Sequence, residues 1–346
     1  MSAPSESSAS FACFGSTCAA LVIGRGPHGS AEEAVAAVER RLLAWHERFS
    51  RFLPDSEISA LNRDPRSQVP ASAMMLALAQ AVHRAGEQTG GLVDGTMLDE
   101  LESAGYVGDL RGSLALGRAL ALAPARRPAG PSRQARWREI EVDLARRTIT
   151  RPQRVKLDGG GLAKGLFADV LARELAPYGG FAINCAGDLA IGGADAIRRP
   201  VNVESPFDGS TIHTFQVRRG GVATSGIGRR SWLDGGVPRH HLLDPASGEP
   251  AFTGIVQVTA LAPSALLAEI RAKAAILSGP GSASRWLPDG GVVVLDDGSH
   301  RVIEPPPLVT LGELARFRDP AELVRAGTPP GPGELAAPQA AMPAFS

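Results

Sequence analysis

The segment LDGGGLAKG, residues 157–165, constrains the fold more than any other part of the chain. It follows a predicted strand, passes three successive glycines and opens a predicted helix that carries Lys164. Such a turn lets the main-chain amides at a helix N-terminus approach an anion closely. These amides and a lysine supply several donors, which suits a pyrophosphate better than a single carboxylate. Asp158 would instead accept a hydrogen bond from a sugar, a base or a metal-bound water.

The two familiar nucleotide-binding patterns do not explain this segment. The Walker pattern needs Gly-Lys followed by Ser or Thr, and the dinucleotide pattern needs GxGxxG, whereas residues 157–165 match neither. Taken alone, the segment is more simply a tight turn between a strand and a helix. Its interpretation therefore depends on the other motifs of the chain.

The first elements of the chain are predicted to be a strand over residues 12–23 and a helix after it. Ser30 followed by Glu33 is a capping box, which marks the start of that helix. Apolar residues then recur at spacings of three and four and are expected to face the core: Val35, Val38, Leu42 and Trp45.

The later pattern mixes helices and strands without a regular βαβ succession. Asp55 or Ser56 is predicted to cap a short helical turn that ends at Asn62, and longer helices are predicted over about 71–89 and 163–176. Alternation of apolar residues predicts a hairpin over about 140–150, and the further strands are FAINC, HTFQV, IVQVTAL and VVVL. We therefore expect an α+β fold, a single domain of mixed sheets with packed helices.

The composition is typical of a globular protein with a sizeable core, since 44% of the 346 residues are hydrophobic and 21% are charged. We expect a flexible N-terminus at residues 1–10 and one domain over residues 11–326. The tail at residues 327–346 is expected to be disordered, because its prolines and glycines preclude regular structure and little apolar surface remains to offset ordering entropy.

The charges and cysteines exclude several classes of function. Thirty-six basic and thirty-six acidic side chains cancel, which gives little support to nucleic-acid binding. The three cysteines are an odd number for a disulfide framework, and no pair has the two-residue spacing of a zinc knuckle or a redox motif. The first residues lack a basic start, and the apolar stretch at 19–23 is too short for a signal core or a membrane span. We therefore expect a cytoplasmic protein.

Three later segments combine polar side chains with small residues. NCAGD at 184–188 ends a predicted strand and suits close packing of the backbone against a ligand or the glycine segment. ATSG at 223–226 presents two hydroxyl groups. HHLLDPASGEP at 240–250 places two histidines before a turn, and one of them could accept a proton near neutral pH. Adjacent strand residues point in opposite directions, so the pattern does not tell which histidine faces a site.

Taken together, these segments resemble the ApbE family, the FAD:protein FMN transferases also described as flavin trafficking proteins. The resemblance runs from about residue 11 to residue 279, and it is that of a divergent member of the family. It rests on segments in family order: FGST at 14–17, FSRFLPDSEISALN at 49–62, GLVDGT at 91–96, DGGGLAKG at 158–165, NCAGD at 184–188, ATSG at 223–226, HLLDPASGEP at 241–250 and APSALLAE at 262–269.

The resemblance implies an ApbE-like fold, related to the T-fold, in which FAD lies in a cleft and a divalent metal, Mg²⁺, contacts its pyrophosphate. FMN would pass to a Thr or Ser hydroxyl of an acceptor flavoprotein, and AMP would leave. The resemblance assigns the base to His241. The FAD site implied by it comprises Phe14, Asn62, Val93, Asp94, Asp158, Lys164 and Leu243.

The metal positions that the resemblance implies are Gly161, through its carbonyl, and Glu269, Ala272 and Lys273. The family motif Ala-Asp-x-x-Ala-Thr reads AEIRAK here, at residues 268–273. Lys273 thus replaces an oxygen ligand with an ammonium that cannot coordinate a cation and would repel it. Glu269 and Lys273 have the spacing of an intrahelical ion pair, which could occupy the volume of the metal. Alternatively, Glu269 and Gly161 still hold Mg²⁺ with water and phosphate oxygens.

Three functions fit these residues. The first is FMN transfer to an acceptor protein. The second is a flavin carrier that binds FAD without reacting. The third is hydrolysis of FAD to FMN and AMP, in which water replaces the acceptor hydroxyl.

Overall fold

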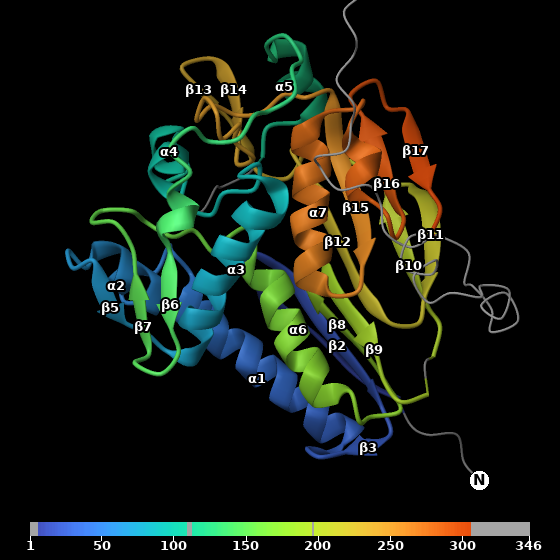
Figure 1. Ribbon diagram of the computed structural model, residues 1–346. Coiled ribbons are helices and arrows are strands. Elements are labelled where there is room, and N and C mark those ends of the chain that lie inside the picture. The colour runs from blue at the N-terminus through green and yellow to red at the C-terminus, as the bar shows by residue number, and fades with distance from the viewer. Residues whose placement is uncertain (1–5, 109–112, 196, 306–346) are drawn as a thin grey trace, which may run out of the picture. The chain divides into compact units, whose positions relative to one another are not determined.

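The computed structural model describes residues 6–108, 113–195 and 197–305, and an eight-stranded sheet forms its centre (Figure 1). Each neighbouring pair of its strands is antiparallel. In spatial order the strands are β1 (Glu6–Cys13), β2 (Ser16–Ile23), β8 (Gly180–Cys185), β9 (Asp188–Gly192), β12 (Gly220–Gly226), β15 (Ile255–Ala262), β16 (Gly291–Leu295) and β17 (His300–Ile303).

Three helices pack against this sheet and share its hydrophobic core (Figure 1). Helix α1 (Ala31–Phe49) contacts β1 and β2, α6 (Ala163–Leu175) contacts β8 and β9, and α7 (Ala265–Ser278) contacts β12 and β15. Helices α6 and α7 also contact each other, which explains why ten of the fourteen residues of α7 are buried. The α+β class expected from the sequence is confirmed.

The smaller elements stand outside this sheet. The helices among them are α2 (Glu57–Arg63), α3 (Ala73–Thr89), α4 (Leu98–Ser103), α5 (Leu116–Leu122) and the 3₁₀ turns Arg136–Glu139 and Ala283–Trp286. One small sheet has the order β5 (Gln68–Pro70), β7 (Thr148–Thr150) and β6 (Glu141–Asp143). The two-stranded pairs are β3 (Arg25–Gly26) with β4 (Gly29–Ser30), β10 (Arg199–Glu204) with β11 (Thr211–Val217), and β13 (Ser231–Asp234) with β14 (Val237–His240).

Most of the local predictions are confirmed. The capping box of Ser30 and Glu33 is present at the start of α1, and Val35, Val38 and Leu42 are buried. Ser56 caps α2, and the helix predicted over about 71–89 is α3. The predicted hairpin over 140–150 is the pair of β6 and β7.

The prediction for the N-terminal region is wrong in two respects. Residues 12–23 are not one strand, because the chain reverses at Phe14 and Gly15, whose φ angles are 55° and 69°. Residues 6–10 are not flexible, because they pair with β2 as far as Glu6 opposite Ile23. The serines of this segment suit the edge of a sheet, where main-chain hydrogen bonds rather than buried side chains hold the strand.

The predicted tail at residues 327–346, and residues 306–326 of the expected domain, lie outside the described residues. Within the part that is described, no helix combines the length and the apolar character that crossing a membrane requires.

Candidate functional site

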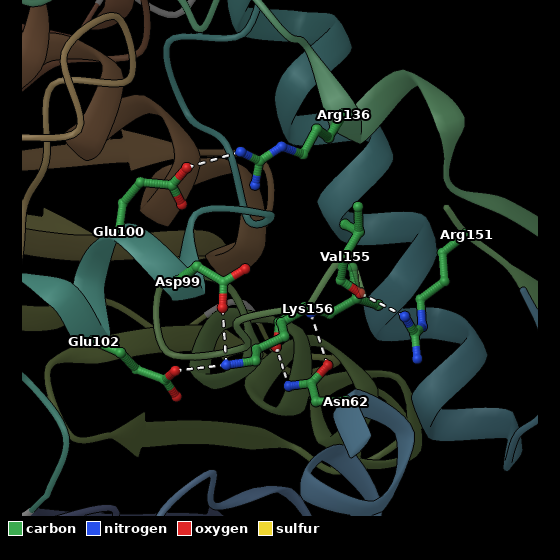
Figure 2. Close-up of polar contacts among 9 residues, drawn as sticks. Asn62, Asp99, Glu100, Glu102, Arg136, Arg151, Val155 and Lys156 are labelled. Carbon is green, nitrogen blue, oxygen red and sulfur yellow. Dashed lines mark hydrogen bonds and ion pairs between the residues drawn. The ribbon is translucent and has the colours of Figure 1, made fainter. Parts of the chain in front are cut away.

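The stretch that enters the glycine segment is held by polar contacts on several sides (Figure 2). The buried Arg151 donates to the carbonyl of Val155 at 2.7 Å, and Lys156 forms ion pairs with Asp99 and Glu102 of α4. Asn62 receives a hydrogen bond from the amide of Leu157 at 2.8 Å and donates to its carbonyl at 2.9 Å. The direction in which the chain enters the turn is therefore fixed.

Asn62 was expected to line the FAD site. Both the oxygen and the nitrogen of its side-chain amide are hydrogen-bonded to the main chain of Leu157. It holds the glycine segment as a main-chain strand pair would. Asparagine suits this task because it offers a donor and an acceptor on one short side chain.

The glycine segment itself is a compact turn into α6. The amide of Asp158 donates to the carbonyl of Gly95 at 2.8 Å, and its carboxylate accepts from the amide of Gly160 at 3.1 Å. The amides of Leu162 and Ala163 both donate hydrogen bonds to the carbonyl of Gly159. The structure therefore brings together the 91–96 and 157–165 segments, which are far apart in the sequence.

Arg51 is a cation at this turn that the sequence reasoning missed. Its Nε atom lies 3.9 Å from Oδ1 of Asp158, and it donates to the carbonyl of Tyr106 at 2.9 Å. Its guanidinium lies 4.3 Å from the ring centre of Phe52 and 4.5 Å from that of Tyr106. The sequence FSRF, in which the arginine lies between two phenylalanines, could have indicated this stacking, since guanidinium groups stack on aromatic faces.

Asp94 and Val93 lie in the loop that contacts Asp158 through Gly95. The carboxylate of Asp94 accepts hydrogen bonds from the amide and the hydroxyl of Thr96, at 2.9 and 2.6 Å, and burial raises its pKa. Val93 is buried in the core, and its amide donates to the hydroxyl of Thr89. The side chain of Val93 therefore shapes the loop from beneath.

A cluster of four charged side chains lies beside the turn, between α6, α7 and the start of β9. Lys164 pairs with Asp188 and also lies 3.6 Å from Oε1 of Glu269. Lys273 donates to the same Glu269 oxygen at 3.1 Å. The other oxygen of Glu269 accepts from the amide of Gly165 at 3.0 Å. We call Lys164, Asp188, Glu269 and Lys273 the charge cluster.

The pKa values in the charge cluster reflect burial set against ion pairing. Burial opposes ionisation of Glu269, but Lys273 and Lys164 outweigh it and lower the pKa of this carboxyl. Burial also opposes ionisation of Lys164, and the carboxylates of Asp188 and Glu269 raise its pKa nevertheless. Burial and the charge of Glu269 raise the pKa of Asp188 to about 7. The carboxylate of Glu269 therefore lies between the side-chain nitrogens of Lys164 and Lys273.

Phe14 lies at the β1–β2 turn with its ring against two aromatic neighbours. Its centre is 5.6 Å from that of Phe167 in α6 and 5.4 Å from that of His46. Cys18 of β2 stands opposite Cys185 of β8, so this turn lies at the end of the sheet where β8 turns into β9. Phe14 therefore belongs to the same end of the sheet as Asp188.

The two adjacent histidines have different surroundings. His240 is buried, packs edge-on against Phe252 and accepts at Nδ1 from the amide of Leu242. His241 is only partly buried, and burial, Arg230, His240 and Lys273 lower its pKa well below the usual value. His241 is therefore a neutral imidazole near the charge cluster, and Arg230 is a further cation of this region.

Leu243 and Ala272 are buried apolar residues. Leu243 packs with Leu98, Leu101, Ala104 and Tyr106 in a small separate cluster beneath α4. Ala272 is fully buried in the main core, where its methyl group offers nothing to a metal.

The family's divalent metal does not fit the residues present. The side chain of Lys273 contacts both expected metal positions. A Cβ on Gly161 would stand 3.0 Å from its Cε, and its Nζ lies 3.1 Å from Oε1 of Glu269. No group of three or more His, Cys, Asp or Glu side chains placed to hold a metal occurs in the described ranges. The expected ion pair between Glu269 and Lys273 is present.

An open pocket of about 320 Å³ lies between α4 and the turn at 244–250. It is lined by Asp99, Glu100 and Glu249, against the single cation Arg239. Each of these carboxylates has a cationic partner: Lys156 pairs with Asp99, Arg136 with Glu100, and Arg239 with Glu249. The pocket therefore offers an incoming pyrophosphate no uncompensated positive charge.

Comparison with known proteins gives a consistent picture. The model of the ApbE family matches residues 14–295. A FAD:protein FMN transferase from Treponema pallidum (strain Nichols) is 30% identical over 139 residues, which span 36% of this chain and only 38% of that relative. The solved ApbE protein from Thermotoga maritima has a TM-score of 0.71 at 22% identity, covering 87% of this chain and 97% of its own. The Pseudomonas stutzeri flavinyl transferase ApbE has a TM-score of 0.68 at 21% identity, covering 88% and 95%.

Proposed function

Because this chain belongs to the ApbE family, we propose that it is an FAD:protein FMN transferase. It would move FMN from FAD to a Thr or Ser hydroxyl of an acceptor flavoprotein and release AMP. One observation supports this proposal: Glu269 joins the charge cluster to the glycine turn, since it accepts from the amide of Gly165 and pairs with Lys164 and Lys273.

The chemistry asks for a fixed pyrophosphate and an activated hydroxyl. The acceptor oxygen attacks the phosphorus on the FMN side, a phosphoester bond forms, and the bond to the bridging oxygen breaks. AMP leaves with that oxygen and its electron pair, and the hydroxyl proton passes to a base. Positive charge beside the phosphates stabilises the developing negative charge.

His241 suits the base because its imidazole is neutral. A hydroxyl is a poor nucleophile at neutral pH, and a positioned base contributes about 10²- to 10⁴-fold to such a step. Burial and the nearby cations keep the pKa of His241 low, so its nitrogen is available across the physiological range.

The test uses the purified protein, FAD and a peptide that contains a candidate Thr or Ser acceptor. Mass spectrometry detects covalent FMN on the peptide, and chromatography detects AMP. We expect both products from the wild-type chain and a loss of about 100-fold or more in rate for His241→Asn, with FAD binding retained. His300→Asn, the same change on an exposed position of β17, is the matched control and should react like wild type.

The outcomes separate the possible functions. AMP without covalent flavin indicates hydrolysis of FAD, and FAD binding without either product indicates a flavin carrier. A chain that binds no FAD under any of these conditions contradicts all three.

A further inference from the structure

Lys273 presents its ammonium at the glycine turn. A Cβ placed on Gly161 would lie 3.0 Å from Cε and 3.8 Å from Nζ of Lys273, so the lysine stem runs directly along the turn. One of the three N–H groups of the ammonium is directed at Glu269, at 3.1 Å. The side chain of Lys273 is 12% exposed, so part of it is open to solvent.

Lys164 differs from Lys273 in its partners. Lys164 lies between the carboxylates of Asp188 and Glu269. Its ion pairs therefore connect α6 to β9 and to α7. Among the residues that the structure describes, Lys273 forms one ion pair, with Glu269. Of the two lysines, Lys273 is therefore the one whose charge is left for an incoming anion.

The charge cluster also opposes a divalent cation. Mg²⁺ would lie about 2 Å from any oxygen that binds it, and an ammonium already stands 3.1 Å from Oε1 of Glu269. The second oxygen of Glu269 accepts from the amide of Gly165. With two lysines against two carboxylates, no excess negative charge remains to offset the desolvation of a divalent ion.

We propose that Lys273 replaces the divalent metal in this chain: its ammonium, held by Glu269, is the cation that binds the FAD pyrophosphate, which makes FAD binding independent of Mg²⁺. This inference rests on the proposed function, because it requires FAD as the ligand. A lysine can do this as a point charge on phosphate oxygens, as lysines of other phosphate sites do. The pair of Glu269 and Lys273 fixes the ammonium before the ligand arrives, which lowers the cost of ordering it.

The first experiment measures FAD affinity by flavin fluorescence, once with excess EDTA and once with MgCl₂. We expect dissociation constants that agree within about twofold, and a calorimetric titration with MgCl₂ alone that shows no specific binding. FAD binding that is lost in EDTA, or tight Mg²⁺ binding in calorimetry, would overturn the proposal.

Substitutions at Lys273 make the test specific. Lys273→Met keeps the length of the side chain without its charge and should weaken FAD binding by about tenfold or more in either condition. Lys273→Thr restores a neutral oxygen ligand beside Glu269 and should make FAD binding stronger in MgCl₂ than in EDTA. Lys273→Arg should retain most of the affinity. An unchanged affinity in Lys273→Met would contradict the assignment.

Arg271→Met is the matched control, since it removes a cation from the same helix that pairs with Asp289 instead of facing the turn. Thermal melting of each variant separates loss of the site from loss of the fold, and Lys273→Thr can gain Mg²⁺ dependence only if it folds. FAD binding that needs Mg²⁺ defeats this inference and leaves the transferase intact. Metal-free FAD binding without FMN transfer leaves the inference intact and defeats the transferase.

Discussion

At the scale of single residues, neighbours in the sequence have opposite roles. His240 ends β14 inside the core, where burial lowers its pKa to about 3. His241, the next residue, is partly exposed near Arg230 and Lys273. His240 is the last residue of β14, and His241 lies in the bend that follows it. The burial of His240 therefore affects the stability of the fold and its pH dependence. The low pKa of His241 instead bears on its proposed role as the base.

The buried His240 should make stability depend on pH. The unfolded chain takes up a proton near pH 6.5, whereas the folded chain does so only near pH 3. Stability from this group is therefore complete above pH 6.5 and falls as the pH drops toward 3, by about 1.4 kcal/mol per pH unit. Urea unfolding between pH 7 and 5 should show a shallower loss for His240→Asn, whose oxygen can still accept from Leu242. Equal slopes for variant and wild type would refute this origin.

At the scale of elements, the close crossing of α6 and α7 builds the charge cluster. Gly165 permits the approach, since a Cβ there would lie 2.8 Å from the carbonyl of Ala265 and the amide of Leu266. Asp169 of α6 accepts from the amides of Ala265 and Leu266 and so caps α7. The amide of Gly165 also reaches Glu269. One glycine thus sets both the distance between the helices and a contact of the site.

Gly165→Ala should therefore separate the two helices. Overpacking of this kind costs about 1–3 kcal/mol, although alanine is favoured over glycine in a helix by about 1 kcal/mol. We expect a lower midpoint of urea unfolding and weaker FAD binding. Gly117→Ala in α5 is the control, because a Cβ there meets nothing within 4 Å and stability should be unchanged or slightly higher. If Gly165→Ala and Gly117→Ala changed stability and FAD binding equally, the α6–α7 crossing would have no special role.

At the scale of the whole described molecule, the site draws on most of the chain. The residues of the proposed site come from separate elements, which the antiparallel sheet and its helices bring together. They are Asn62, Gly95, the glycine turn, Asp188, His241 and Lys273. The site therefore exists only when these elements are assembled. If FAD binds there as proposed, its binding would be coupled to the folding of the entire unit.

FAD should accordingly raise the melting temperature in one cooperative step. At a hundredfold excess over its dissociation constant, a ligand stabilises the folded state by about 2.7 kcal/mol. For a domain of this size that is a shift of about 4 °C. Calorimetry measures it, and Lys273→Met should show a smaller shift at the same FAD concentration. A melting curve in which FAD displaces only part of the transition would contradict this coupling.

The sequence by itself determined the local elements and the order of the motifs. Capping residues and periodic apolar residues marked α1, α2 and α3 because these features act within one turn of the chain. The spacing of Glu269 and Lys273 predicted their ion pair for the same local reason. The reversal at Phe14 was missed, because the apolar pattern continues on both sides of the turn.

Only the tertiary structure decided which groups of the glycine segment are free to meet a ligand. Lys164, predicted to bind the anion, is held by Asp188 and Glu269, which lie 24 and 105 positions further along the chain. Asn62 is spent on Leu157, and Lys273 comes to the turn from α7. Such pairings depend on the sheet order and the α6–α7 crossing. No pattern of neighbouring residues encodes contacts of that kind, because their partners are distant in sequence.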